Sequence, residues 1–447
     1  MTRENWKQLC AAERFEAHFK AFMSPEGVQF ATPAAERAYQ DRVQMLKDVV
    51  QLKKPKRVPV CPIIGFYPFA YAGVTPEEAM YDYDKLGLAL KKFHADFVPD
   101  SLAIAPVYGS GKVFDILGYK LYRWPGRGVP PTAPYQCVEA EYMHADEYDE
   151  FINDPSGYFT RFYLPRVFAA LEGWQMLAPV TDVLELPFFG PYIVPIGIPK
   201  VQESFQKLLE AGRAAMEWIQ AASAVDAATL TTLGLPSVFG GFTKAPFDTL
   251  GDTLRGTHGI MLDKFRQPRK LLAAMEKLVP IGIDLGVRSA GPQHPVVFMP
   301  LHKGADGFMS DDDFKTFYWP TLKAVILGLI EQGNVPYLFV EGSYNHRLDV
   351  IADSGIPRGT TIWMFDQTDM KEVKKKFGSW ACFGGNVPVS MLKAGKPQQV
   401  KDYVKRVIDD CAQDGGFILA NGAVLDDAEP ANLHAMIDTG KEYGVYR

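Results

Sequence analysis

The sequence predicts an α/β protein folded as a (β/α)8 barrel, the TIM barrel, with an N-terminal helical extension. Short apolar segments alternate with amphipathic helical segments through the C-terminal half, and this alternation is typical of parallel βαβ units. So many units in succession favour a closed barrel, and a length of 447 residues suits one large α/β barrel. A doubly wound open sheet is the alternative fold.

The N-terminal half is the less regular part of the pattern. Residues 1–55 are polar with a helical pattern and end in the basic run KKPKR at 53–57. Residues 113–145 are rich in proline and glycine, which predicts a hairpin and an excursion of the kind found in a lid or a sheet edge. The other elements expected in this half are strands at 58–66 and 97–106 and helices at 147–178 and 199–223.

The C-terminal half shows the clearest alternation. The expected strands are 237–242, 296–304, 335–342, 360–365, 381–386 and 417–423. The helices expected among them are 269–285, 311–332, 369–377, 398–413 and 430–443. We therefore divide the chain into a helical extension, residues 1–57, and a single barrel, residues 58–447, with an insertion around 107–145.

Composition narrows the functional classes. The net charge of −6 offers no basic surface for nucleic acid, and no apolar stretch reaches the length of a membrane span. The five cysteines form no CxxC pair, and the charged N-terminus does not resemble a secretory signal. We expect a cytoplasmic protein that binds neither nucleic acid nor membrane.

Several segments resemble the uroporphyrinogen decarboxylase superfamily. They are DRVQMLKDVVQLKKPKRVPVCP at 41–62, HKGADGFMSDDDFKTFYWPTLKAVILGLIEQGNVPYLFVEGSYNHRL at 302–348, FGGNVPVSML at 383–392 and DGGFILANGAVLDDAEPANLHAMIDTGKEYG at 414–444. The resemblance implies a (β/α)8 barrel. The superfamily contains the decarboxylase itself and corrinoid-linked methyltransferases, and this chain resembles the chloromethane-utilisation and O-demethylation relatives.

The first departure from the family pattern concerns positive charge. The decarboxylase carries an arginine-bearing motif after its first strand, where it holds a tetrapyrrole with eight carboxylates. At that place this chain reads IIGFYPFAYAG, residues 63–73, without an arginine. Buried carboxylates without cationic partners are strongly unfavourable, so the tetrapyrrole becomes an improbable substrate.

The second departure concerns thiolate ligands. The coenzyme M branch of the family binds zinc through a His-x-Cys pair and a late cysteine. Here the pair aligns with Glu341 and Ser343, and the late cysteine aligns with Ala423. The resemblance therefore implies no site for activating a thiol, and it leaves zinc an open question.

Three residues at predicted strand ends are the candidate catalytic groups: His302, Glu341 and Asp366. The carboxyl ends of barrel strands are where such folds carry their chemistry. His302 and Glu341 are also the candidate ligands of a metal, because imidazole and carboxylate suit zinc and similar ions. Without a metal, the same groups could donate a proton to a departing oxygen.

Each candidate also has a structural interpretation. His302 could only hydrogen-bond to the backbone, and Glu341 could anchor the loop SYNHR through His346 or Arg347. Asp366 could cap the helix that begins near Asp369, because aspartate is a favoured N-cap residue.

Aromatic and amide side chains are the candidate substrate-binding residues. The segment FYPFAY follows the first predicted strand, and it could line a pocket for an aromatic substrate or pack inside the barrel. Two asparagines end later strands. The candidates are Phe66, Tyr67, Phe69, Tyr71, Asn386 and Asn421; Asn386 could instead form only a turn.

The resemblance, narrowed by these departures, implies a corrinoid-dependent methyltransferase. It would move a methyl group between a small methylated substrate, for example an aryl methyl ether, and the cobalt of cobalamin. The D-x-H-x-x-G pattern of cobalamin carriers is absent from this sequence, so we expect the cobalamin on a partner corrinoid protein. One alternative is a cofactor-independent decarboxylase acting on a less anionic substrate, with Asp366 stabilising a cationic intermediate. Another alternative is a non-catalytic subunit that binds the corrinoid protein. A homodimer is a possible oligomeric state that the sequence does not decide.

Overall fold

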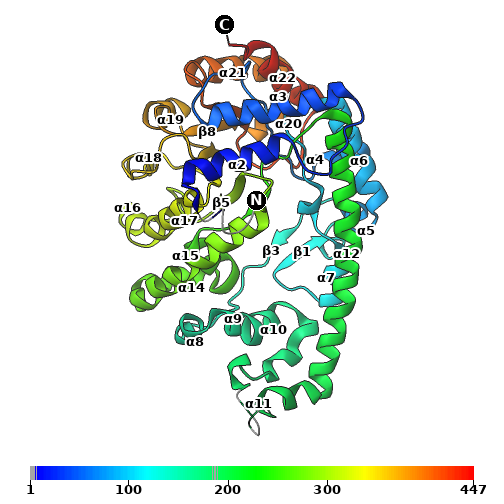
Figure 1. Ribbon diagram of the computed structural model, residues 1–447, viewed down its shortest axis with the longest axis vertical. Helices are drawn as coiled ribbons and strands as arrows, with labels where there is room; N and C mark the ends of the chain where they lie inside the picture. Colours follow the sequence, from blue (N-terminus) through cyan, green and yellow to red (C-terminus); the bar gives the residue numbers. More distant parts are fainter. Residues whose placement is uncertain (1–5, 7, 184, 186–187, 189, 447) are drawn as a thin grey trace.

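The computed structural model describes residues 6, 8–183, 185, 188 and 190–446. Its centre is a parallel sheet in which each strand pairs with the next along the chain, in the order β4-β5-β6-β7-β8-β9 (Figure 1). The strands are β4 Gly241–Phe242, β5 Val296–Leu301, β6 Val335–Val340, β7 Ile362–Phe365, β8 Cys382–Val387 and β9 Phe417–Asn421. All six strands expected in the C-terminal half are therefore present.

Two extended segments close this sheet into a ring. The segment 58–66 pairs in parallel with the last strand and the residues after it, through the bridges Val60–Leu419 and Ile64–Leu425. The Asp100 amide donates to the Val60 carbonyl (2.9 Å), and the Leu102 amide donates to the Pro236 carbonyl (3.0 Å), shortly before β4. The predicted (β/α)8 barrel is confirmed.

These two segments are less regular than the strands predicted there, and the reason lies in two side chains. The Asn421 side chain accepts from the Ile63 amide and donates to the Ile63 carbonyl, both at 2.9 Å. A carboxylate oxygen of Asp100 accepts from the Val60 amide (2.8 Å). Side chains thus satisfy backbone groups that a continuous ladder would otherwise pair.

Helices cover the outside of the barrel. Along the chain from β4 they are α13 Pro246–Asp248, η6 Thr249–Leu254, α14 Gly256–Arg266, α15 Pro268–Ala290, α16 Asp311–Asp313, η7 Phe314–Tyr318, α17 Trp319–Glu331, α18 Leu348–Ala352, α19 Met370–Phe377, α20 Val389–Ala394, α21 Pro397–Cys411 and α22 Pro430–Tyr443. Successive side chains of a strand point to opposite faces of the sheet. In β6, Leu338 and Val340 pack outward against helices, whereas Tyr337 and Phe339 point to the barrel interior.

The two N-terminal helices, α2 Ala11–Met23 and α3 Pro33–Val50, cover the amino end of the barrel. They share one buried cluster with the interior side chains of the strands: Phe19, Phe22, Tyr39, Val43, Leu46, Val49, Val335, Ile362, Cys382 and Ile418. Arg42 also donates to the Gly234 carbonyl before β4 (2.8 Å). This packing leaves the opposite, carboxyl end for a functional site; the division of the chain at residue 57 stays a prediction.

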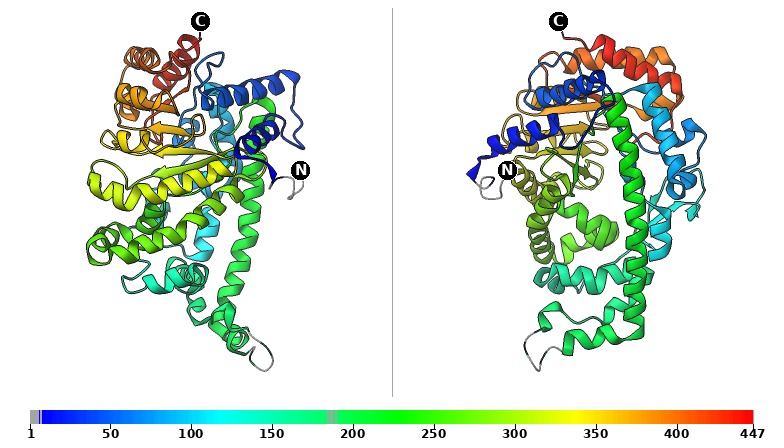
Figure 2. Two further views of the ribbon diagram at one scale, coloured as in Figure 1. Left: turned by 60° about the vertical axis from the view of Figure 1, so that its left-hand side comes forward. Right: turned by 45° about the vertical axis from the view of Figure 1, so that its right-hand side comes forward.

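An elaborate region lies between the second barrel segment and β4. Its elements, with those just before it, are α4 Tyr67–Ala72, α5 Pro76–Tyr81, α6 Tyr83–Phe97, η1 Ala105–Tyr108, α7 Gly111–Leu117, β1 Tyr122–Pro125, β2 Gly128–Val129, β3 Gln136–Cys137, α8 Tyr148–Asn153, α9 Pro155–Tyr158, η2 Phe159–Tyr163, α10 Leu164–Val167, η3 Ala169–Met176, η4 Val180–Asp182, α11 Gly190–Ile193, η5 Val194–Gly197 and α12 Pro199–Leu233. The hairpin predicted within 113–145 appears as the antiparallel pair β1–β3. The excursion continues beyond 145, because α12 runs along the barrel from a lobe that contains α11 (Figure 2).

Helix α12 has 35 residues, yet its polar content keeps it from being a membrane span. Across all described residues, no helix combines the length and the apolar character needed to cross a bilayer.

We expect Asp100→Asn to lower the free energy of unfolding by roughly 3 kcal/mol, because it breaks a buried ion pair that joins the two closing segments. Asp100 is nearly inaccessible, and Arg57 donates to both of its oxygens (2.5 and 2.6 Å). Guanidinium unfolding followed by circular dichroism measures the change. The matched control is Asp284→Asn, which removes an exposed pair with Arg288 and should cost less than about 0.5 kcal/mol.

The same pair predicts the pH dependence of stability. Burial alone would raise the pKa of Asp100, but hydrogen bonds and charge from Arg57 outweigh it and hold that pKa below its usual value. The contribution is therefore complete above the unfolded-state pKa, about 3.9, and is lost as pH falls through the lower folded-state pKa. Equal acid sensitivity of wild type and Asp100→Asn would contradict this assignment.

Candidate active site

A cavity of about 600 Å³ lies at the carboxyl ends of the barrel strands. Apolar and aromatic side chains form most of its lining, among them Phe66, Tyr108, Tyr135, Phe239 and Phe298. The Lys, His, Glu and Asp side chains that line it are Lys244, His302, Glu341 and Asp426. A mostly apolar cavity with a few convergent polar groups, at this end of a barrel, is the expected position of an active site.

His302 follows β5 and is held from both sides. Its Nδ1 atom lies 2.6 Å from a carboxylate oxygen of Asp252, which belongs to η6. Its Nε2 atom faces Oε1 of Glu341, at the end of β6, at 3.7 Å. The bond to Asp252 fixes the ring, because it places a proton on Nδ1 and turns Nε2 toward Glu341 and the cavity.

A fully buried carboxylate, Asp248, anchors the backbone beneath the histidine. Its oxygens accept from the amides of His302 (3.1 Å) and Lys303 (2.9 Å) and from the Tyr318 hydroxyl (2.7 Å). Two cations balance the neighbouring Asp252: Lys244 Nζ lies 2.6 Å from one of its oxygens, and Lys303 Nζ lies 3.0 Å from the other.

These contacts lower the pKa of Asp252 and raise the pKa values of His302 and Glu341. Burial would raise the pKa of Asp252, but the hydrogen bond from His302 and the nearby lysines hold it far below its usual value. Burial would lower the pKa of His302, but the bond to Asp252 and the charges of Asp248 and Glu341 raise it. Burial, reinforced by the nearby aspartates, raises the pKa of Glu341 despite the opposing effect of His302. His302 and Glu341 therefore each retain a proton to higher pH than the isolated group would.

The third predicted catalytic residue, Asp366, lies behind this pair and outside the cavity lining. Its Oδ2 atom accepts from the Gly342 amide (3.1 Å), so it supports the turn after Glu341. Burial raises the pKa of Asp366, and its charge contributes to the raised pKa of Glu341. The N-cap interpretation of Asp366 is wrong: Asp369 caps α19 by accepting from the amides of Lys371 and Glu372.

The structural interpretations of the other two candidates are also wrong. Glu341 does not anchor the SYNHR loop, because Arg347 is paired with Asp306 and Asp311. His302 makes its ring contacts to carboxylates, whereas only its backbone amide serves the fold. The structure thus brings His302 and Glu341 together in the cavity.

The two asparagines serve the backbone. Asn386 donates to the carbonyls of Asp366 (2.9 Å) and Thr368 (3.0 Å), and its oxygen accepts from the Tyr403 hydroxyl (3.0 Å). The Asn421 side chain is hydrogen-bonded to the amide and the carbonyl of Ile63 in the closing segment. Neither side chain lines the cavity, because the amide groups of both side chains are hydrogen-bonded to backbone atoms near the strand ends.

Of the four aromatic candidates, only Phe66 lines the cavity. Helix α4 begins at the next residue and turns Tyr67 and Phe69 into the core, where both are almost fully buried. Tyr71 lies outside the cavity, and its hydroxyl donates to Asp96 (2.8 Å). Assigning Tyr67, Phe69 and Tyr71 to substrate contact is therefore not supported by their placement.

Four polar residues of the site were not predicted from the sequence: Lys244, Asp248, Asp252 and Asp426. The available signal was the spacing in KAPFDTLGD, which sets two aspartates four residues apart directly after a strand. Asp426 accepts from the Phe66 amide (2.8 Å) and approaches so closely that a Cβ atom at Gly65 would lie 2.2 Å from its oxygen. That position therefore requires glycine.

The donor set does not fit a zinc centre. Among the described residues, no group of three His, Cys, Asp or Glu side chains converges as metal ligands. His302 and Glu341 supply two donors, whereas a catalytic zinc has three protein ligands and an open position. The geometry instead suits two facing titratable groups, either of which can donate a proton into the cavity.

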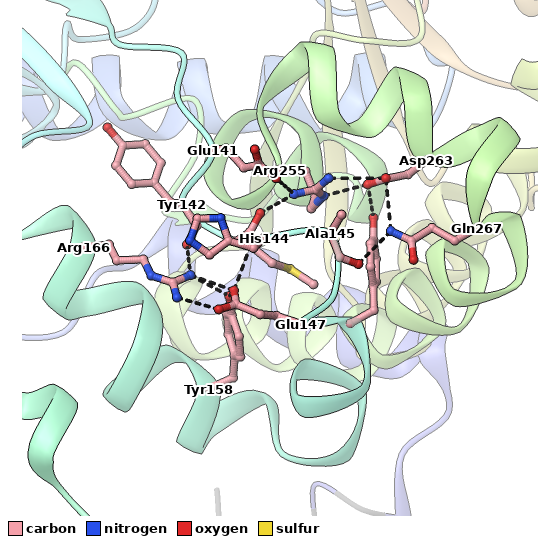
Figure 3. Close-up of polar contacts among 12 residues, drawn as sticks. Glu141, Tyr142, His144, Ala145, Glu147, Tyr158, Arg166, Arg255, Asp263 and Gln267 are labelled. Carbon is pink, nitrogen blue, oxygen red and sulfur yellow. Dashed lines mark hydrogen bonds and ion pairs between the residues drawn. The ribbon is translucent and has the colours of Figure 1, made fainter.

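A second network of polar contacts fixes the chain after β3 against α14 and the helices α9 and α10 (Figure 3). Arg255, almost fully buried, contacts Glu141 and the Met143 carbonyl and donates to Asp263 (2.6 Å). Nearby, Arg166 donates to both oxygens of Glu147 (2.5 and 2.7 Å). These pairs hold the chain that follows β3 in a defined position beside the cavity.

The fold and the site together define a (β/α)8-barrel protein with a facing His–Glu pair in a largely apolar cavity at the carboxyl ends of its strands. The chain belongs to the uroporphyrinogen decarboxylase (URO-D) family, whose model matches residues 197–443. The resemblance inferred from sequence segments is thereby confirmed.

Two individual relatives show how far this similarity extends. A uroporphyrinogen decarboxylase from Chlorobium luteolum is 27% identical over 139 residues, which are 30% of this chain and 38% of that protein. The match thus spans well under half of that relative's length. A methyltransferase from Methanosarcina mazei shares the fold with a TM-score of 0.54 and 15% identity, over 91% of this chain and 98% of that one.

Proposed function

We propose that this protein is a methyltransferase that moves a methyl group between a small methylated aromatic substrate and the cobalt of a corrinoid carried by a partner protein. The observation that carries the proposal is the pair His302–Glu341, whose Nε2 and Oε1 atoms face each other at 3.7 Å in a cavity with mostly apolar and aromatic walls. The methyltransferase with the same fold supports the reaction class.

The pair would perform the step that an aryl methyl ether finds difficult. The phenolate oxygen is a poor leaving group, and protonation as the methyl–oxygen bond breaks stabilises it. A corrinoid on the partner protein would supply the electron pair that accepts the methyl group. Glu341 or the Nε2 atom of His302 gives its proton to the oxygen, Asp252 keeps the imidazole oriented, and the apolar walls limit the access of water.

The lining also argues against a tetrapyrrole substrate. Within the described part of the chain, the cavity lining contains no arginine, and its cationic groups are Lys244 and His302. Lys244 is already bound to Asp252. Eight carboxylates would lack partners, whereas a neutral methoxylated ring fits a cavity of about 600 Å³.

The test is the visible spectrum of anaerobic cob(I)alamin with the protein and a panel of methoxylated aromatics. We expect a methylcobalamin band that grows only when both the protein and a particular ether are present. Omitting the ether, or heating the protein first, provides the control. If no panel member gives the band, with free cob(I)alamin or with a corrinoid carrier protein, the proposal fails for this substrate class.

A further inference from the structure

A second cavity, of about 390 Å³, adjoins the active-site cavity. It lies against α7 and the small sheet of β1 and β3, away from the barrel axis. The two cavities share the lining residues Val107, Tyr108, Tyr122 and Tyr135. We call this second space the side chamber.

The side chamber is an aromatic box. The Phe114 and Trp124 rings meet edge to face at 5.4 Å between centroids, and Tyr119 stacks on Phe168 at 5.1 Å. Within the described residues, no charged side chain belongs to its lining, whereas Lys244, His302, Glu341 and Asp426 reach the active-site cavity. A ligand spanning both spaces would place its polar, reacting end at His302 and an uncharged aromatic group in the side chamber.

Two tyrosines stand between the two spaces. The rings of Tyr122 and Tyr135 meet at right angles, 5.6 Å between centroids. In the part of the chain that the structure describes, neither hydroxyl has a hydrogen-bond partner. Burial raises the pKa of both, so each remains a proton donor available to an ether or hydroxyl oxygen between two rings.

We infer that the side chamber is a substrate subsite, and that the substrate class is an uncharged methoxylated aromatic compound with a second aromatic ring. The inference rests on the proposed function for the reacting end only. Size supports it: an apolar cavity of about 150 Å³ holds benzene, so the side chamber has room for a substituted ring. A single-ring ether would leave the chamber unused.

Calorimetric titration of the full chain with methoxybenzene and with 4-methoxybiphenyl tests the subsite without a corrinoid. We expect the two-ring compound to bind more tightly, by about tenfold or more, because its second ring is transferred from water into the apolar side chamber. Binding without methyl transfer in the cobalt assay would overturn the proposed function and keep the subsite. Equal affinity, or no binding of either compound, would overturn the subsite.

Variants at Val113, which lines the side chamber from α7, locate the second ring. Val113→Phe should abolish the preference for the two-ring compound while changing methoxybenzene affinity by less than about twofold. Val113→Ala enlarges the chamber and should keep the preference. Lys112→Phe adds the same ring on the exposed neighbouring position and is the matched control. If Val113→Phe weakens both compounds equally, or if Lys112→Phe acts like Val113→Phe, the second ring does not lie in the chamber.

Discussion

Replacing Glu341 by glutamine is expected to lower the rate of methyl transfer by about 10²- to 10⁴-fold, the range that a positioned proton donor contributes. Glutamine keeps the size and the oxygen of the side chain, but it cannot give a proton to a leaving oxygen. Glu341 lies 3.7 Å from His302 and lines the cavity, so the change removes one of the two proton donors at the reacting end. Burial raises the pKa of the native carboxyl, which favours the protonated form that glutamine resembles in shape.

The measurement is the initial rate of cobalt methylation with a fixed methoxylated aromatic, together with the unfolding midpoint of each variant. Glutamine at 341 should leave the midpoint unchanged, because this side chain is partly exposed and makes no backbone contact that the fold requires. Glu210→Gln on α12, an exposed carboxylate paired with Lys207, is the matched control and should transfer at the wild-type rate. A Glu341→Gln variant that transfers within about threefold of wild type would remove the carboxyl from the mechanism.

The barrel could be predicted because the residue pattern of each strand depends on the burial of that strand alone. A strand buried on both faces must be apolar throughout, and VPYLFV in β6 is fully buried along its length. It was harder to predict whether the two closing segments would form regular strands or irregular extended chain. Whether the backbone of Val60 or Ile63 pairs with a strand or with a side chain depends on Asp100 and Asn421, which lie far away along the sequence.

The candidate site could be predicted only in part, for a related reason. His302 and Glu341 were identifiable because each directly follows a strand, and the topology brings neighbouring strand ends together. The spacing of Asp248 and Asp252 was visible, but the pairing of Asp252 with His302 was not, because the two lie 50 residues apart and Asp252 projects from a π-helical turn. The wrongly placed aromatics have a local cause: α4 begins one residue after Phe66, so the remaining rings follow a helix into the core.

Asp252→Asn is expected to lower the rate near neutral pH by about 10²-fold and to move the pH profile to lower values. The proposed transfer needs a proton on His302 or Glu341, so the rate should fall as pH rises through the pKa values of these two groups. The hydrogen bond and charge of Asp252 help hold the pKa of His302 above its ordinary value of 6.5. A neutral asparagine removes that effect, so burial then lowers this pKa and the fall in rate begins at lower pH.

The displacement of the pH profile distinguishes a positioning role from a purely structural one. Loss of Asp252 also leaves Lys244 and Lys303 with weaker partners, so some loss of stability is expected, and an unfolding curve of the variant measures it. Histidine NMR titration should show the pKa of His302 lowered in Asp252→Asn and unchanged in Asp284→Asn, an exposed control far along the chain. A variant that is slower at every pH by the same factor, with the pKa of His302 unmoved, would assign Asp252 to the fold alone. A lowered pKa with a shifted profile would instead show that the proton for the leaving oxygen depends on the Asp252–His302–Glu341 arrangement.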